Sequence, residues 1–150
     1  MAYWLFKSEP DVFSWEDLKA KGAAGEEWDG VRNYQARNNM REMKVGDLGF
    51  YYHSNAGKDI VGICMVSAPA HPDSTTEDER WECVDVRAVI DMPTAITLAD
   101  VKGDPALSEM SLVTSMRLSV QPVTDAEWKH VCKKGGLSQK AIKDAVKALK

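Results

Sequence analysis

The feature that most constrains the fold is the close spacing of the strand patterns in the middle of the chain. Two apolar and aromatic stretches, "DLGFYYHS" at 47–54 and "IVGICMVSA" at 60–68, are separated only by "NAGKD" at 55–59. Such a short connection, rich in turn-forming residues, predicts a β-hairpin. A third strand pattern, "WECVDVRAVIDM" at 81–92, follows after a polar loop. A doubly wound parallel sheet would need crossover helices of a dozen or more residues, and none separates these patterns.

Short helices are predicted around these strands. Three capping-box patterns mark helix starts: Ser14 with Asp17, Thr97 with Asp100, and Thr124 with Glu127. "NYQARNNMREMK" at 33–44 predicts a further helix, and 138–150 predicts a basic amphipathic one. In this last helix the inward residues are Ile142, Ala145, Val146 and Leu149, and the outward ones are Lys140, Lys143, Lys147 and Lys150.

Two more strand patterns complete the prediction of fold class. "AYWLFKSE" at 2–9 opens the chain, and "LSVQPV" at 118–123 is expected to end at Pro122. Strands interrupted by short helices, without regular βαβ alternation, favour an α+β fold around an antiparallel or mixed, barrel-like sheet. The chain has 150 residues and shows no internal repeat or linker, so we expect a single domain over residues 1–150.

The charges are unevenly distributed. The net charge is −4, yet residues 32–44 carry Arg32, Arg37, Arg41 and Lys44 against Glu42 alone. Residues 129–150 carry seven lysines against one aspartate, which we interpret as a solvated helix face. A polyanion could meet such basic segments locally, but the acidic total limits any nucleic-acid contact to a small area.

The composition also indicates a compartment. No apolar run reaches 18 residues, so no membrane partner is expected. "MAYWLFKSEP" lacks the charged leader and cleavage site of a signal peptide. Cys64, Cys83 and Cys132 are odd in number and widely spaced, which favours free thiols in a reducing cytoplasm.

Several kinds of active site lack their sequence signature. The three histidines and three cysteines show no paired metal-ligand spacing, so we expect no metal. The glycines match neither a P-loop nor a dinucleotide fingerprint, and we expect no cofactor. No Gly-x-Ser-x-Gly elbow exists. Lys7 with Ser8, and His53 with Ser54, are strand neighbours that face opposite sides, so neither makes a natural nucleophile–base pair.

What remains is a set of planar and hydrogen-bonding side chains at the ends of predicted elements. Trp28 and Trp81 lie at polar ends of elements, unlike the three other tryptophans, which we expect in the core or half-buried. "FYYHSN" at 50–55 and the pairs at 7–8 and 32–33 add hydroxyl, amide and cationic groups. Such a set suits a heteroaromatic ring that is stacked by aromatic side chains and read at its edge.

Six motifs in order carry a specific resemblance. "YWLFKSEP" at 3–10, "WDGVRNYQARN" at 28–38, "FYYHSN" at 50–55, "HPD" at 71–73, "RWECVDV" at 80–86 and "RLSVQPVT" at 117–124 resemble those of the EVE domain family, in the PUA-like superfamily. The resemblance covers about residues 2–135 and implies a PUA-like mixed β pseudo-barrel surrounded by short α-helices. It further implies non-enzymatic binding of a modified nucleobase, in DNA or RNA, in an aromatic-lined pocket. Without a basic N-terminal extension or a nuclease domain, the chain looks like a stand-alone, bacterial-type member.

The same resemblance implies the site residues. Trp28, Tyr52 or Trp81 would stack on the base, and Ser8, Asn33 and Ser54 would read its edge. Lys7, Arg32 and Arg117 would hold phosphate or a carbonyl, with His53 in the pocket wall. Two alternatives remain open at this stage. One is a small hydrolase or amidohydrolase acting on a modified nucleoside, with Lys7, Tyr52 and His53 as acid or base. The other is a protein-interaction module with an aromatic groove for a peptide.

Overall fold

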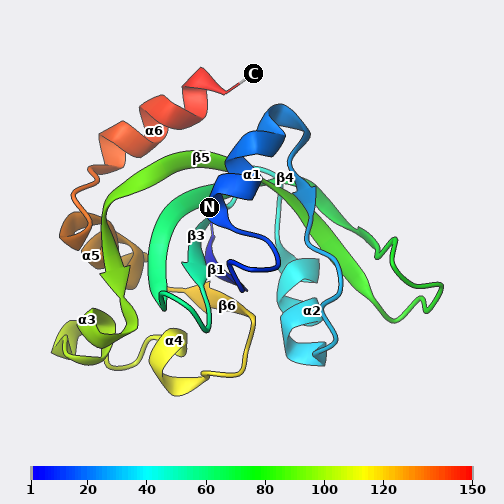
Figure 1. Cartoon of the computed structure of the whole chain (residues 1–150), viewed down its shortest axis with the longest axis horizontal. Helices are drawn as coiled ribbons and strands as arrows, with labels where there is room; N and C mark the ends of the chain where they lie inside the picture. Colours follow the sequence, from blue (N-terminus) through cyan, green and yellow to red (C-terminus); the bar gives the residue numbers. More distant parts are fainter. Residues whose placement is uncertain (1, 150) are drawn as a thin grey trace.

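The computed structural model describes residues 2–149 and shows a mixed six-stranded sheet with helices on both faces (Figure 1). The sheet order is β2-β5-β4-β3-β1-β6, and every neighbouring pair is antiparallel except β1 with β3. The predicted α+β class with a mixed sheet is therefore confirmed. The elements in chain order are β1 (Tyr3–Ser8), α1 (Trp15–Lys21), η1 (Gly22–Ala24), β2 (Glu26–Glu27), α2 (Tyr34–Glu42), β3 (Leu48–His53), β4 (Asp59–Pro72), β5 (Glu82–Thr97), α3 (Leu98–Lys102), η2 (Pro105–Leu107), α4 (Ser111–Thr114), β6 (Val120–Val123), α5 (Asp125–Lys134) and α6 (Gln139–Ala148).

The predicted hairpin is confirmed as β3 and β4, which pair antiparallel across a turn at residues 54–58. Asn55 and Lys58 adopt positive φ angles of 64° and 50° in this turn. β4 and β5 are longer than their patterns predicted, and they curve across the whole molecule (Figure 1). Register shifts along the β4–β5 pair accompany this curvature, because each irregularity bends and twists the strands locally.

The core has two parts, one on each face of the sheet. In β1 the alternation of side chains sends Trp4 and Phe6 to one face and Leu5 to the other. The face of Trp4 and Phe6 is covered by α1 and α2, and the face of Leu5 is packed by residues of α3, α4, α5 and α6. Trp15 and Trp128 are 3% and 0% exposed, so the prediction that both are core residues is confirmed.

The helix starts follow the predicted capping boxes. In each capping box the hydroxyl of the first residue accepts a hydrogen bond from the backbone N–H three residues later, and these first residues are Ser14, Thr97 and Thr124. The carboxylate at the later position accepts a hydrogen bond from the backbone N–H of the first residue in return. The predicted terminal helix is α6, with Ile142 buried and its described lysines exposed. Lys150, which closed that predicted helix, lies outside the described residues.

The prediction that the last strand ends at Pro122 is wrong. Pro122 does not end its strand but lies within β6, paired with Trp4 of β1. β6 is the edge strand of the sheet, and there the missing N–H of proline leaves no ladder partner unsatisfied. All three cysteines are free, as predicted, and the structure shows that they are also buried. None of the described helices is both long and apolar enough to cross a membrane.

Candidate functional site

A pocket of about 270 Å³ lies beside the end of β1, where the chain leaves the sheet. We call it the β1 pocket. It combines aromatic, hydroxyl, cationic and carboxylate side chains with backbone from the segment between β2 and α2. Its lining residues are Lys7, Ser8, Val12, Phe13, Glu26, Glu27, Trp28, Asp29, Gly30, Val31 and Ser119. Three of the predicted site residues, Lys7, Ser8 and Trp28, thus come together here.

Lys7 and Ser8 are positioned by contacts with loops on either side of β1. The Lys7 ammonium donates to the carbonyl of Met116 at 2.5 Å, and burial lowers the pKa of this lysine. The Ser8 hydroxyl donates to the carbonyl of Phe13 at 2.7 Å. Its oxygen lone pairs can still accept a hydrogen bond from a ligand. Both side chains are therefore held before any ligand arrives.

Trp28 is built into the core beneath the pocket and is 7% exposed. Its backbone N–H donates to the carbonyl of Val84 at 2.8 Å. The rings of Phe6 and Tyr51 meet it edge to face, at centroid distances of 5.4 and 5.6 Å. Within residues 2–149 no other ring lies parallel to the indole.

Asp29 is a pocket residue that sequence reasoning missed. None of the described residues donates a hydrogen bond to its carboxylate or pairs with it as an ion. Burial, followed by the nearby carboxylates of Asp73 and Glu27, raises the pKa of Asp29. The Asp29 side chain is exposed, so water can hydrate its carboxylate, and the same oxygens can accept hydrogen bonds from ligand N–H groups. Its position after Trp28 in "WDG" was the only signal, and an aspartate before a glycine usually indicates just a turn.

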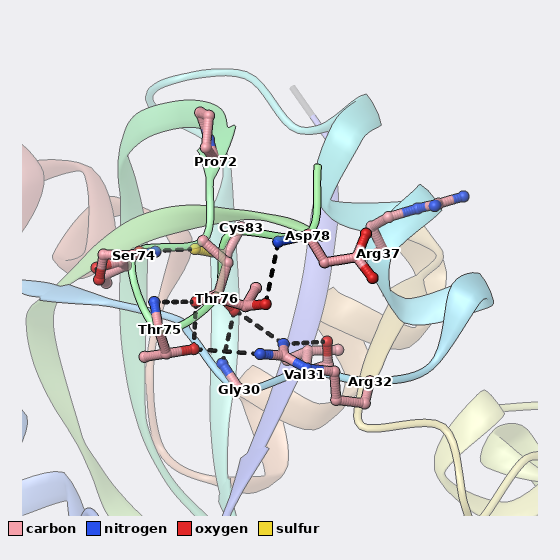
Figure 2. Close-up of polar contacts among 12 residues, drawn as sticks. Gly30, Val31, Arg32, Arg37, Pro72, Ser74, Thr75, Thr76, Asp78 and Cys83 are labelled. Atoms are coloured by element: carbon pink, nitrogen blue, oxygen red, sulfur yellow. Dashed lines mark hydrogen bonds and ion pairs between the residues drawn. The ribbon is translucent and has the colours of Figure 1, made fainter. Parts of the chain in front are cut away.

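The rim of the pocket is fixed by Asp73, which lies in the loop after β4. Figure 2 shows Gly30, Val31 and Arg32 meeting this loop. Asp73 accepts hydrogen bonds from the Gly30 N–H at 2.9 Å, from Arg32 Nη1 at 3.0 Å and from the N–H of Thr75 at 2.8 Å. Burial alone would raise the pKa of Asp73, but its hydrogen bonds outweigh burial and lower it to about 2. This buried carboxylate thus ties the pocket rim to the sheet.

A second, smaller pocket of about 180 Å³ contains two other predicted residues, Tyr52 and Ser54. Lys7 lines both pockets, and its ammonium lies 6.0 Å from the centre of the Tyr52 ring. Tyr52 is 4% exposed and belongs to the core on the opposite face of the sheet from Trp28. The two rings therefore do not form one sandwich for a single base.

The remaining predicted residues lie outside both pockets. Asn33 caps α2 by accepting from the Ala36 N–H at 2.9 Å. His53 Nε2 accepts from the backbone N–H of Trp15 at 3.0 Å, so its imidazole holds the start of α1. Arg117 is exposed, and it has no hydrogen-bond or ion-pair partner among the described residues.

Arg32 and Trp81 form a separate group beside the pocket rim. The Arg32 guanidinium lies 5.4 Å from the centre of the Trp81 ring, and that ring stacks on Tyr34 at 5.0 Å. Trp81 is half-buried beside Tyr34 of α2 and is not part of the lining of the β1 pocket.

One group of potential metal ligands comes together in the part of the chain that the structure describes. Glu27, His71 and Cys83 place ligand atoms within 4.8 Å of one another. These groups already have partners, because Cys83 Sγ donates to Glu27 at 3.3 Å and His71 Nε2 lies 2.7 Å from Asp85. Their hydrogen bonds satisfy the cluster without a cation, and the absence of a metal stays a prediction.

Comparison with solved structures supports the fold. The YTH domain of Zygosaccharomyces rouxii MRB1 aligns with a TM-score of 0.56 at 18% identity, over 92% of this chain and 88% of that chain. At this identity the likeness concerns the fold alone.

Nearer relatives share sequence as well as fold. A crystal structure of an Agrobacterium tumefaciens protein is 64% identical, with a TM-score of 0.91 over 93% of this chain and 96% of that chain. Human THYN1 protein, solved in complex with 5-methylcytosine containing DNA, is 38% identical, with a TM-score of 0.84 over 92% and 99% of the two chains. Mouse thymocyte nuclear protein 1 is 40% identical over 86% of this chain and 71% of its own length. The family profile of the EVE domain matches residues 2–134, so this chain belongs to the EVE domain family.

Proposed function

We propose that this protein binds a modified nucleobase of DNA or RNA in the β1 pocket and releases it chemically unchanged. The observation that carries the proposal is that the Trp28 indole, the Ser8 hydroxyl and the exposed carboxylate of Asp29 line one pocket. A volume of about 270 Å³ is smaller than sites for drug-sized ligands, which span roughly 300–1,000 Å³. It suits a single base turned out of its strand, at a cost of a few kcal/mol.

The chemistry of the pocket favours a base with an amino edge. A carboxylate accepts from the exocyclic amino group of cytosine, whereas a carbonyl at the same position would face it lone pair to lone pair. The Ser8 oxygen can accept a second hydrogen bond, and the Lys7 ammonium adds a donor for a carbonyl or phosphate. The human relative in complex with 5-methylcytosine containing DNA supports a methylated cytosine as the first candidate.

The positions of the candidate acids and bases support binding without turnover. Lys7 contacts the Tyr52 ring, but His53 is directed to the backbone of α1. Among the described residues, the three groups do not converge on one pocket. A hydrolase needs a nucleophile or an activated water within hydrogen-bond reach of its base.

The test is equilibrium binding of free modified nucleosides and of matched DNA and RNA oligonucleotides, followed by mass spectrometry of the recovered ligand. We expect saturable binding of an amino-bearing modified base, with its mass unchanged. Trp28→Phe keeps an aromatic ring in the core but shrinks the stacking surface, so it should weaken binding. Lys143→Ala on the exposed face of α6 is the matched control and should bind as the unaltered protein does. A changed ligand mass would show an enzyme, and no binding to any nucleoside or oligonucleotide would overturn the proposal.

A further inference from the structure

A layered surface of two arginines and two aromatic rings adjoins the β1 pocket. Arg37 lies over the Tyr34 ring at 4.9 Å, and Tyr34 stacks on Trp81 at 5.0 Å with 23° between the ring planes. Arg32 lies over the Trp81 ring at 5.4 Å. We call these four residues the arginine–aromatic stack. Tyr34 is 50% exposed, so the stack lies at the surface.

The stack does not offer a free ring to a base. Each aromatic ring packs against the other and also carries a guanidinium. The outer layers of the stack are therefore the guanidinium groups of Arg32 and Arg37. Aromatic rings fix the planes of such groups by stacking and cation–π attraction. The groups that this surface offers to a ligand are therefore positively charged hydrogen-bond donors and not free aromatic ring faces.

The two arginines differ in how their charges are balanced. Arg32 forms an ion pair with the buried carboxylate of Asp73 at 3.0 Å. Arg37 hydrogen-bonds only to uncharged acceptors, the side-chain oxygen of Asn38 and the backbone carbonyl of Arg80. No acidic residue among the described ones pairs with Arg37. Its positive charge is therefore available to an anion.

Arg37 also keeps the donors that an anion needs. Three of its N–H groups are used: Nε and one on Nη2 go to Asn38, and one on Nη1 goes to Arg80 at 2.9 Å. A guanidinium has five N–H groups, so one remains on each terminal nitrogen. Two donors on neighbouring nitrogens match the oxygens of a phosphate. Because the Tyr34 ring and Asn38 already hold the side chain, little rotamer entropy is lost on binding.

The stack lies where a strand would leave the pocket. Gly30 and Val31 line the β1 pocket, Arg32 follows directly in the chain, and Arg37 lies one turn into α2. Figure 2 shows the Arg37 guanidinium extending from α2 away from the loop that holds Gly30. A base in the β1 pocket would therefore have its flanking phosphates beside this surface.

We propose that the arginine–aromatic stack binds the phosphate backbone of the nucleic-acid strand whose base occupies the β1 pocket, with Arg37 as the phosphate donor. This inference rests on the proposed function of the pocket. Its partner is a polyanionic strand, because the charge of Arg37 is not balanced by an acidic residue in the part of the chain that the structure describes. Phosphate contacts carry no sequence information, so the stack adds affinity and leaves base selection to the pocket.

The test compares a free modified nucleoside with an oligonucleotide that contains it, over a range of salt concentrations. For Arg37→Ala we expect about tenfold weaker oligonucleotide binding and a salt slope smaller by about 1. The affinity for the free nucleoside should not change, and modified and unmodified oligonucleotides should weaken by the same factor. Arg37→Lys keeps the charge without the planar fork, so it should restore the slope but only part of the affinity. Lys143→Ala removes a positive charge on α6 and should leave all values unchanged.

The outcomes separate the two proposals. If the unaltered protein binds neither the nucleoside nor the oligonucleotide, the proposed function fails and this inference with it. If it binds both, but folded Arg37→Ala keeps the same oligonucleotide affinity and salt slope, only the phosphate role of the stack is overturned. A tenfold loss that appears equally with the free nucleoside would place Arg37 in the base pocket instead, and would also overturn the inference.

Discussion

Replacing Asp73 by asparagine tests the physical account of the pocket rim. The Asp73 side chain is 2% exposed and accepts hydrogen bonds from Gly30, Arg32 and Thr75. These bonds lower its pKa from the ordinary 3.8 to about 2. A difference of this size corresponds to about 2 kcal/mol of folding stability at neutral pH. In Asp73→Asn the side chain carries no charge, and its amide NH₂ would face a hydrogen-bond donor. We therefore expect the free energy of unfolding to fall by about 2–3 kcal/mol.

The pH dependence of this loss is the sharper part of the prediction. The folded pKa of Asp73 lies below the unfolded value, so its stabilisation is complete above about pH 4 and disappears as the pH falls towards 2. Roughly half of it should remain at about pH 3. The difference between the unaltered protein and Asp73→Asn should therefore shrink on acidification.

Urea unfolding followed by tryptophan fluorescence at several pH values measures both quantities. Asp144→Asn is the control, because Asp144 pairs with Lys140 at the exposed surface of α6 and should change stability little. A loss from Asp73→Asn that stays constant between neutral pH and pH 3 would refute the linkage argument. A loss no larger than that of the control would refute the role of Asp73 in holding the rim.

Three further predictions concern the pocket and the frame that supports it. Binding of an amino-bearing base should weaken as the pH falls through the raised pKa of Asp29, because the carboxylate that accepts the hydrogen bond becomes protonated. Titrations of binding affinity against pH measure this effect, and Asp29→Asn should remove it. Gly62→Ala would place a methyl group 2.2 Å from the Trp15 ring, so it should cost about 1–3 kcal/mol in urea unfolding. Thr124→Ala removes the side-chain cap of α5 and should lower the free energy of unfolding in urea by about 1 kcal/mol. An unchanged unfolding midpoint would show that the capping hydrogen bond contributes nothing.

The order of strands in the sheet shows where prediction from the sequence stopped. The hairpin of β3 and β4 was predictable, because a five-residue connection leaves few other arrangements. The parallel pairing of β1 with β3 had no local signal, since these strands are separated by two helices and by β2. The position of Pro122 within β6 likewise depended on which strand lies at the sheet edge, and that is a property of the whole sheet.

The site was predicted only in part for a similar reason. The motifs correctly indicated Lys7, Ser8 and Trp28 as neighbours in space, although they come from different strands and loops. They also suggested Tyr52 and Trp81 as alternative stacking rings in the same pocket, but the structure places Tyr52 on the other face of the sheet and a half-buried Trp81 beside Tyr34. Alternation assigns a side chain to a face but does not say which loops close over that face.

By itself, the sequence determined the helix starts, the hairpin, the buried faces and the family. Each of these depends on residues a few positions apart, or on motifs that stand in order along the chain. Only the tertiary structure decided which charges remain unbalanced. Arg32 is neutralised by Asp73, 41 positions away, while Arg37 and Asp29 have no ion-pair partner among the described residues. The reason is physical: a charge is balanced by what lies within a few ångströms of it, and folding alone brings such groups together.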